Sequence, residues 1–519
     1  MRITARRANR RLVVASICAA LAAAGGVAGC ASSSGAGGGP DPASLVPARA
    51  TLYAEAVIRP DAAQAGGAEA ALARILRTGD VPGTLSRLFD RAAQKHGVTF
   101  AKDIEPWLGD RAAVAALSVG GPQTDAVLVA ASSDDEKANA ALQKILPGAE
   151  QRTYRDVAYR VDAREHAAGA VFGSSLVLGT EEGLKAAVDA SKGSSLADSD
   201  GLKKGRETVA QDRVGFLYLD VAGLVRGALS SAGGAAAQAA PFLDPVTKAL
   251  PSTVAVGLQA QADLLRLDGA AFGNGGGPQP AGSGADALAK LPADAWLGVG
   301  IGDLGQTVNG FLDRVSSGGG IAAIAVDALL RQAGQSAGLD IRRDLLAWMG
   351  DAGIFAAGAS GDHMGGALVV TSKDPAATRS AVRRLATLAR STGAGSVDPL
   401  NAAGVDEGFI VRGKGDSPDI LVAAGGDRFV VAAGREALQD ALSPAGSLTD
   451  SPAFRDVAGK LGSGVRPSFF VDVEKLRALG AAKPGAGDHG RTLEAFGAVA
   501  GGTTRDGDIT RARAVATLR

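Results

Sequence analysis

The sequence predicts an α+β protein in which one unit occurs twice, giving two similar domains, each with a mostly antiparallel sheet covered by helices. Three observations lead to this prediction. Five short motifs recur in the same order, closely spaced strand patterns alternate with amphipathic helical ones, and a Gly/Pro/Ser-rich segment separates the two copies. Strands only a few residues apart pair as antiparallel hairpins, because parallel neighbours need a long crossover connection.

The internal repeat is the strongest of these signals, since a repeat defines the unit that folds. The spacing between partners is 245 residues from Pro47 to Pro292, 241 from Trp107 to Trp348 and 252 from Asp220 to Asp472. The matching segments are Leu45–Ala48 with Leu291–Asp294, Glu105–Asp110 with Leu346–Asp351, Ala126–Ala130 with Ala367–Thr371, Ser195–Ser199 with Ser447–Ser451, and Leu217–Val221 with Phe469–Val473. Two of the three tryptophans thus fall in register.

Individual elements follow from the period of the apolar residues. Helices are expected over Asp134–Ile145, Glu181–Ala190 and Ala376–Ala389. The clearest hairpins join Arg111–Leu117 to Asp125–Ala131, Ala168–Phe172 to Ser175–Gly179, Val254–Gln261 to Leu264–Phe272, and Ala498–Thr503 to Ile509–Leu518. The last pair flanks Asp506 and Gly507, which are typical hairpin-turn residues.

The chain divides by composition into five parts. They are a signal peptide over residues 1–29, a Gly/Ser tether over 30–42, a first α+β repeat domain over 43–273, a linker over 274–284, and a second over 285–519. A tether of this composition has a root-mean-square reach of roughly 15–20 Å.

The N-terminus has the three parts of a secretory signal. Five arginines precede the apolar run Leu12–Val27, and small residues lead to Cys30 in Val27-Ala28-Gly29-Cys30. We expect cleavage before Cys30 and lipid attachment to that cysteine, which places the body on the extracytoplasmic face of the cell membrane. The alternative is an uncleaved anchor helix, although residues 12–29 are at the lower limit for a membrane span. Sec and Tat export both stay open.

Cysteine and charge limit the remaining chemistry. The chain has two cysteines, Cys18 in the signal and Cys30, so the mature body carries no free thiol for catalysis or for a metal. The 54 basic residues fall to 49 without the five signal arginines, against 54 acidic ones, a net charge of about −5. No basic block with interleaved aromatics occurs, so nucleic acid is not an expected partner. No cofactor is expected either.

The lipobox ending at Cys30, the Leu45–Ala48 opening, the Leu-x-Asp-Ser motifs and the strand ends at Asp220 and Asp472 together resemble an uncharacterised bacterial family. Its members are exported or membrane-anchored proteins of high-GC Gram-positive bacteria, grouped under a domain of unknown function. The resemblance covers essentially the whole mature chain. It implies an extracytoplasmic location and supplies no catalytic residues.

Two motifs resemble those of enzymes, but we interpret both as structural rather than catalytic or cofactor-binding. Gly300-Ile301-Gly302-Asp303-Leu304-Gly305 matches a dinucleotide fingerprint, but no acidic strand end follows and the first copy has no glycine there. Gly334-Gln335-Ser336-Ala337-Gly338 matches a hydrolase elbow, which needs a preceding strand, whereas residues 324–332 have a helical pattern. The four histidines, His96, His166, His363 and His489, have no metal-ligand spacing.

Other polar motifs are expected to act locally. Asp220 and Asp472 precede helical stretches and are expected to cap them. Either Asp198 and Asp450 or Ser199 and Ser451 are similarly placed to cap helices. Trp107 and Trp348 are expected in the core. Asp198–Gly201 and Asp506–Asp508 resemble fragments of calcium loops but lack the full series of oxygen donors, so we interpret them as turns.

Three functions stay open from the sequence. The leading one is a non-enzymatic, lipid-anchored binding or scaffold protein of the cell envelope, with a protein partner there. The second is a carrier of an apolar ligand or lipid, which an apolar pocket of several hundred Å³ would favour. The third is an envelope enzyme with polar residues converging between the two copies.

Overall fold

The computed structural model describes residues 39–94, 97–117, 125–231, 250–273, 284–317, 328, 340–358, 365–392, 395–413, 418–481 and 493–519. Several predictions fall outside the described residues: the signal peptide, Cys30, most of the tether and linker, Ser336, and His96, His363 and His489. The chain forms two compact units, one from residues 1–238 and 251–273, the other from 239–250 and 274–519.

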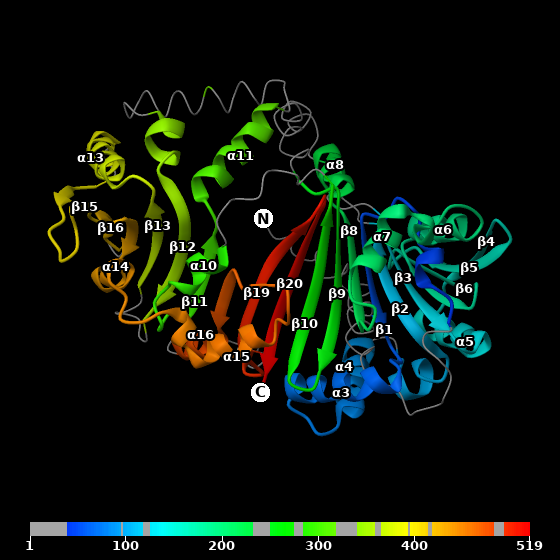
Figure 1. Cartoon of the computed structure of the whole chain (residues 1–519). Coiled ribbons are helices and arrows are strands. Elements are labelled where there is room, and N and C mark those ends of the chain that lie inside the picture. The colour runs from blue at the N-terminus through cyan, green and yellow to red at the C-terminus, as the bar shows by residue number, and fades with distance from the viewer. Residues whose placement is uncertain are drawn as a thin grey trace, which may run out of the picture. The chain divides into compact units, whose positions relative to one another are not determined.

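The first unit, blue to green in Figure 1, alternates strands with helices. Its strands are β1 Leu52–Val57, β2 Leu108–Ala116, β3 Ala126–Ser132, β4 Glu150–Tyr154, β5 Val157–Asp162, β6 Ala167–Phe172, β7 Ser175–Gly179, β8 Gly215–Asp220, β9 Thr253–Gln261 and β10 Leu264–Phe272. Its helices and helical turns are η1 Pro42–Leu45, α3 Ala62–Leu76, α4 Val81–Ala93, η3 Phe100–Ile104, α5 Asp135–Ile145, α6 Glu181–Ser191, η4 Leu196–Asp198, α7 Asp200–Thr208 and α8 Val221–Ser231.

The second unit, green to red in Figure 1, has a similar succession of elements. Its strands are β11 Leu297–Ile301, β12 Met349–Ala357, β13 Gly365–Ser372, β14 Val397–Pro399, β15 Glu407–Val411, β16 Ile420–Gly425, β17 Arg428–Ala433, β18 Phe469–Asp472, β19 Phe496–Asp506 and β20 Ile509–Leu518. Its helices and helical turns are α10 Gly284–Ala289, α11 Leu304–Ser317, η5 Ile341–Leu346, α13 Pro375–Thr392, α14 Arg435–Leu442, η7 Leu448–Asp450, α15 Pro452–Gly459 and α16 Val473–Ala481.

All twenty strands in the described part of the chain belong to one antiparallel sheet. The prediction of two duplicated domains, each with its own sheet, is therefore wrong, although the α+β mixture and the antiparallel pairing are present. The physical reason is that an edge strand keeps one row of backbone N–H and C=O groups unpaired, which accepts a further strand. An apolar pattern marks where a strand lies but not where its sheet ends.

Within each unit the strand order follows from the pairings. The first unit has the order β4-β5-β6-β7-β3-β2-β1-β8-β9-β10. The second has β14-β15-β16-β17-β13-β12-β11-β18-β19-β20. The four predicted hairpins are confirmed as β2–β3, β6–β7, β9–β10 and β19–β20, and the three predicted helices as α5, α6 and α13.

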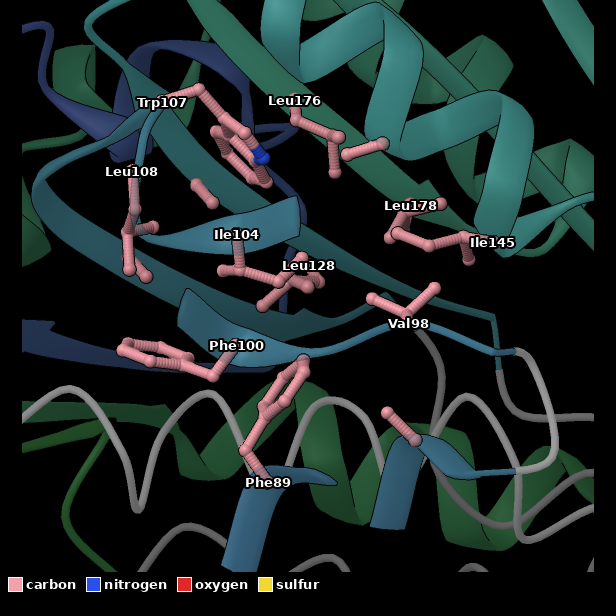
Figure 2. Close-up of a cluster of buried hydrophobic side chains, with 14 of the residues drawn as sticks. Phe89, Val98, Phe100, Ile104, Trp107, Leu108, Leu128, Ile145, Leu176 and Leu178 are labelled. Atoms are coloured by element: carbon pink, nitrogen blue, oxygen red, sulfur yellow. The ribbon is translucent and has the colours of Figure 1, made fainter. Parts of the chain in front are cut away.

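The core of the first unit lies between one face of the sheet and helices α3, α4 and α5. Figure 2 shows how Phe89 of α4 and Phe100 of η3 meet below Leu128 of β3, with Trp107 on the other side of Ile104. The rings of Phe89 and Phe100 are 5.5 Å apart in an edge-to-face arrangement. The second unit has a comparable core, in which the rings of Trp348 and Phe429 are 5.4 Å apart.

Among the described residues, no helix combines the length and the apolar character that a membrane crossing requires.

Candidate functional site

The sheet of the first unit carries an apolar surface that continues beyond the core. Paired residues of antiparallel strands have their side chains on the same face, and Ala56, which packs against the core, starts a row that runs across β8, β9 and β10. The next two rows start at Ala54 and Leu52, and a shorter row on the same face pairs Ala260 with Leu265. We call this surface the apolar face; its large side chains are Leu217, Leu219, Val254, Val256, Leu258, Leu265 and Leu267.

None of the large residues of the apolar face is buried. Leu267 is 44% exposed, and the other six are partly exposed. Helix α3 contacts β9 at the end of that strand, where Gly67 lies against Ala260 and Gln261. The three strands therefore present a continuous apolar surface that the core helices leave partly open.

The opposite face of the same strands is closed. Phe216, Tyr218 and Ala255 are buried there, and α7 packs on β9. A Cβ on Gly205 of α7 would lie 2.9 Å from the Cβ of Ala255, so the helix sits directly on the strand. The exposure of the apolar face is thus specific to one side of the sheet.

The second unit has a corresponding surface on β11, β12, β18 and β19. The pairings place Leu297 beside Val471, and Val299 beside both Phe469 and Ile354. Ile354 is 39% exposed, and the other four are partly exposed.

A second candidate is a cluster of charged side chains on the closed face of the first unit, centred on Arg206 of α7. One guanidinium holds both carboxylate oxygens of Asp41, at 2.6 and 3.0 Å. Its Nη2 also donates to Glu55 Oε2 at 2.7 Å, and the hydroxyl of Tyr53 donates to the same oxygen at 2.8 Å. The side chain of Glu55 is 8% exposed, and Arg111 contacts its second oxygen at 3.4 Å.

The charges of this cluster stabilise one another. Burial raises the pKa of Asp41, but the hydrogen bonds and positive charge of Arg206 outweigh burial, so the pKa lies below its usual range. Burial lowers the pKa of Arg206, and Asp41 and Glu55 outweigh it in the same way, so this pKa is raised. Burial, and then the carboxylate of Glu55, raise the pKa of Tyr53 well above its ordinary value. The groups are therefore held as an ion-paired network, with a tyrosine that stays protonated.

Sequence reasoning missed this cluster because its members lie far apart in the chain. Arg206 is 165 residues from Asp41 and 151 from Glu55. The available signal was Glu55 itself, a carboxylate in the middle of a strand pattern, since buried glutamates are almost always paired.

The glycine-rich segment at Gly300 serves packing. A Cβ on Gly300 would lie 1.8 Å from the main-chain oxygen of Gly284, and one on Gly305 would lie 2.2 Å from that of Leu346. These glycines let neighbouring backbones approach each other. This packing role agrees with the interpretation of Gly300–Gly305 as a structural segment rather than a dinucleotide-binding motif.

Asp303, within the same segment, is a buried carboxylate on a left-handed backbone, with φ 35°. Its side chain accepts from the amide of Gln306 at 3.1 Å and from Lys373 Nζ at 2.8 Å, and its own amide donates to Asp351 at 2.9 Å. The carboxylate thus caps α11 and neutralises a lysine.

The remaining predicted residues have local roles. Asp220 and Asp472 accept from the amides of Gly223 and Lys475 at 2.9 and 3.0 Å, which confirms that both cap helices.

Asp198 accepts from Ser195 N at 2.9 Å and Asp450 accepts from Ser447 N at 2.8 Å, each in a capping box.

The aspartates of the two alternatives therefore cap in both copies. Of the serines, Ser199 also caps α7 through the amide of Leu202 at 3.2 Å, whereas Ser451 makes no side-chain cap. Trp107 and Trp348 are both buried, as predicted.

The remaining motifs, at His166 and Gly507, lie in separate turns and form no common site. His166 lies in the turn between β5 and β6, with a left-handed backbone. Gly507, also left-handed, forms the turn between β19 and β20. No group of three His, Cys, Asp or Glu side chains that could hold a metal ion is found in the described part of the chain.

Residues 12–484 match the model of a family described as a protein of unknown function (DUF3352). No curated protein matches the sequence. Among solved structures, crystal forms I and III of TP0453 are each 12% identical with a TM-score of 0.25. The alignments cover 46% of this chain and 81% of that chain for form I, and 45% and 81% for form III.

Proposed function

The chain belongs to the DUF3352 family of proteins of unknown function, and we propose from its own residues that it is a lipid-anchored, non-enzymatic binding protein of the cell envelope. Its body lies on the extracytoplasmic face of the membrane. The observation that carries the proposal is the apolar face of β8, β9 and β10, with Leu267 44% exposed. Contiguous apolar surface of this kind marks interaction sites in soluble proteins.

The anchor is supported by the N-terminal sequence. Five arginines, an apolar run and Val27-Ala28-Gly29-Cys30 stand in the order that a lipoprotein signal requires. Lipid on Cys30 would hold the body at the membrane without any spanning helix in it.

Binding is favoured over catalysis by the state of the polar groups. Arg206, Asp41 and Glu55 are engaged with one another, and Asp303 with Lys373. A catalytic acid, base or nucleophile has to reach its substrate, whereas these groups are occupied by partners within the fold.

The anchor is tested by labelling cells with radioactive palmitate. The wild-type chain should incorporate label and fractionate with membranes, and Cys30→Ser should do neither. Cys18→Ser is the matched control and should behave like the wild type. Equal labelling of wild type and Cys30→Ser would overturn the lipid anchor.

The binding site is tested by photo-crosslinking in the same host. A photoreactive residue replaces Leu267 on the apolar face or Leu88 on α4, which is 43% exposed. We expect a discrete crosslinked product from position 267 only. Identical products from both positions, or none from 267, would show that the apolar face is not the binding site.

A second candidate function is the carrier of an apolar ligand or lipid, and the apolar face specifically favours it. Native mass spectrometry of the full chain with Cys30→Ser tests this candidate. A carrier should show an added mass that disappears on denaturation and is reduced in Leu267→Gln but not in Leu88→Gln. A clean unliganded mass would contradict the carrier and favour a protein partner.

A further inference from the structure

Arg213 lies in the segment between α7 and β8 and is partly buried. Its Nη1 donates to the main-chain oxygens of Ala210 at 3.0 Å and Arg206 at 3.4 Å, at the end of α7. Its Cζ lies 5.0 Å from the ring centre of Phe216, and its Cδ would lie 3.5 Å from a Cβ on Gly257 of β9. The guanidinium is therefore fixed between the helix end and the closed face of the sheet.

The outer edge of this guanidinium has no partner. No carboxylate forms an ion pair with Arg213 in the described part of the chain, and the adjacent Asp212 accepts from the side-chain amide of Gln259 instead. Its Nε and Nη2 donate to no described group, and neither is enclosed by protein atoms, so both face solvent. These two nitrogens carry the parallel N–H groups with which an arginine holds two oxygens of an oxyanion.

The charges around Arg213 leave a positive charge without compensation. Arg111, Arg206 and Arg213 carry three positive charges, and Asp41 and Glu55 carry two negative ones, an excess of one positive charge. Burial lowers the pKa of Arg213. The carboxylate of Glu55 raises this pKa, but the charges of Arg206 and Arg111 oppose that effect, so the pKa lies below its ordinary value. A partly buried positive charge of this kind favours an anion beside it.

Arg111 is close enough to contribute to the same site. It pairs with Val57 of β1, whose amide donates to the oxygen of Val214, the residue after Arg213. One strand thus separates the two arginines, a backbone distance of about 10 Å, which two long side chains can span. Nη1 of Arg111 contacts Glu55 at 3.4 Å, whereas its Nη2 has no described partner and is not enclosed.

We propose that Arg213, together with Arg111, binds a phosphate group on the closed face of the first unit. Phosphate fits this site better than a carboxylate, because it offers two oxygens to Arg213 and a third to Arg111. At the place equivalent to Val214 the second unit has Arg466, whose charge Asp286 neutralises. The site lies on the other side of the sheet from the apolar face, and it goes beyond the proposed function without depending on it.

Thermal unfolding of the full chain with Cys30→Ser tests the site, with inorganic phosphate as the probe. Sodium phosphate replaces sodium chloride at neutral pH and constant ionic strength. We expect a saturable rise in Tm of about 2–4 °C once phosphate exceeds its Kd several-fold. Arg213→Gln should lose this rise and keep only the small, non-saturating increase that phosphate gives to proteins in general.

Arg428→Gln is the matched control, because Arg428 also donates to a main-chain oxygen at a helix end, that of Ala441 at 2.6 Å. It should keep the saturable rise. Arg213→Lys keeps the charge but loses the paired N–H groups, so it should need about tenfold more phosphate. An equal response of Arg213→Gln and the wild type, or an equal loss in Arg428→Gln, would overturn the site.

Co-sedimentation with phosphatidylglycerol vesicles distinguishes two sources of the phosphate group. Vesicle binding that Arg213→Gln abolishes assigns the site to a lipid headgroup, and stabilisation by phosphate without vesicle binding assigns it to a soluble phosphate compound. Either result supports the site, whereas vesicle binding that survives in Arg213→Gln, with no saturable response to phosphate, contradicts it. These outcomes are independent of palmitate labelling and of crosslinking at Leu267, so failure of the site and failure of the proposed function are distinguishable.

Discussion

The indole nitrogen of Trp107 donates a hydrogen bond to the main-chain oxygen of Asp103 at 2.6 Å. The same bond recurs in the second unit, from Trp348 to Asp344 at 2.9 Å. In both units the aspartate lies within a π-helical turn, Phe100–Ile104 or Ile341–Leu346. Its side chain pairs with a basic residue of the next helix, which is Lys144 of α5 for Asp103 and Arg384 of α13 for Asp344. Each turn is thus fixed both to the core and to a covering helix.

This relationship predicts a graded loss of stability at Trp107. Trp107→Phe keeps most of the buried ring but leaves the oxygen of Asp103 without its donor, which should cost about 1–3 kcal/mol. Trp107→Ala also leaves a cavity and should cost about 3–5 kcal/mol. Urea unfolding followed by circular dichroism measures both. Leu88→Ala, at an exposed position, should stay within about 0.5 kcal/mol of the wild type.

The lowered pKa of Asp344 predicts that the free energy of unfolding falls in acid. The hydrogen bond from Arg343, the amide of Asp340 and the charge of Arg384 hold the pKa of Asp344 at about 2. Because an unfolded aspartate has a pKa of about 3.9, the carboxylate stabilises the fold above pH 4, and that contribution is lost as the pH falls from about 4 to about 2.

Asp344→Asn should therefore be less stable than the wild type at pH 7, with the difference shrinking towards pH 2. Urea unfolding at a series of pH values measures it, and Asp156→Asn, whose side chain is fully exposed, should follow the wild-type profile. A stability difference that does not depend on pH would contradict the assigned role of the Asp344 charge.

The packing role of Gly300 predicts opposite effects of two alanine substitutions. Gly300→Ala places a Cβ within 1.8 Å of Gly284 O, so the strand and α10 must move apart, at a cost of about 1–3 kcal/mol. Gly310 lies inside α11 with no atom within 4 Å of the added Cβ, so Gly310→Ala should stabilise by about 0.5–1 kcal/mol. Thermal unfolding of both variants checks the signs, and a stabilising Gly300→Ala would refute the packing explanation.

The helix caps predict different costs at two matched serines. Ser199→Ala removes the acceptor for the amide of Leu202 and should cost about 1 kcal/mol. Ser451→Ala removes no side-chain cap and should cost less than about 0.5 kcal/mol. Equal losses in chemical denaturation would show that Ser199 does not stabilise α7 through its side chain.

The local features of this protein could be predicted from its residues. Short-range patterns predicted the hairpins, the helices, the capping aspartates and the buried tryptophans, because each depends on residues that are near one another in the chain. The resemblance to a family of unknown function could also be recognised, since its motifs are short and follow one another in a fixed order. The export signal at Cys30 is equally local, and it stays a prediction.

Which surfaces meet depends on long-range contacts that short sequence patterns do not record. The apolar pattern of Leu217, Val256 and Leu267 resembles that of any half-buried strand, and their exposure depends on which part of the sheet the helices cover. Likewise, Arg206 joins Asp41 and Glu55 only because β1, α7 and the N-terminal segment converge in the fold. The extent of the single sheet depends on edge hydrogen bonds, which every backbone offers and no side-chain pattern records.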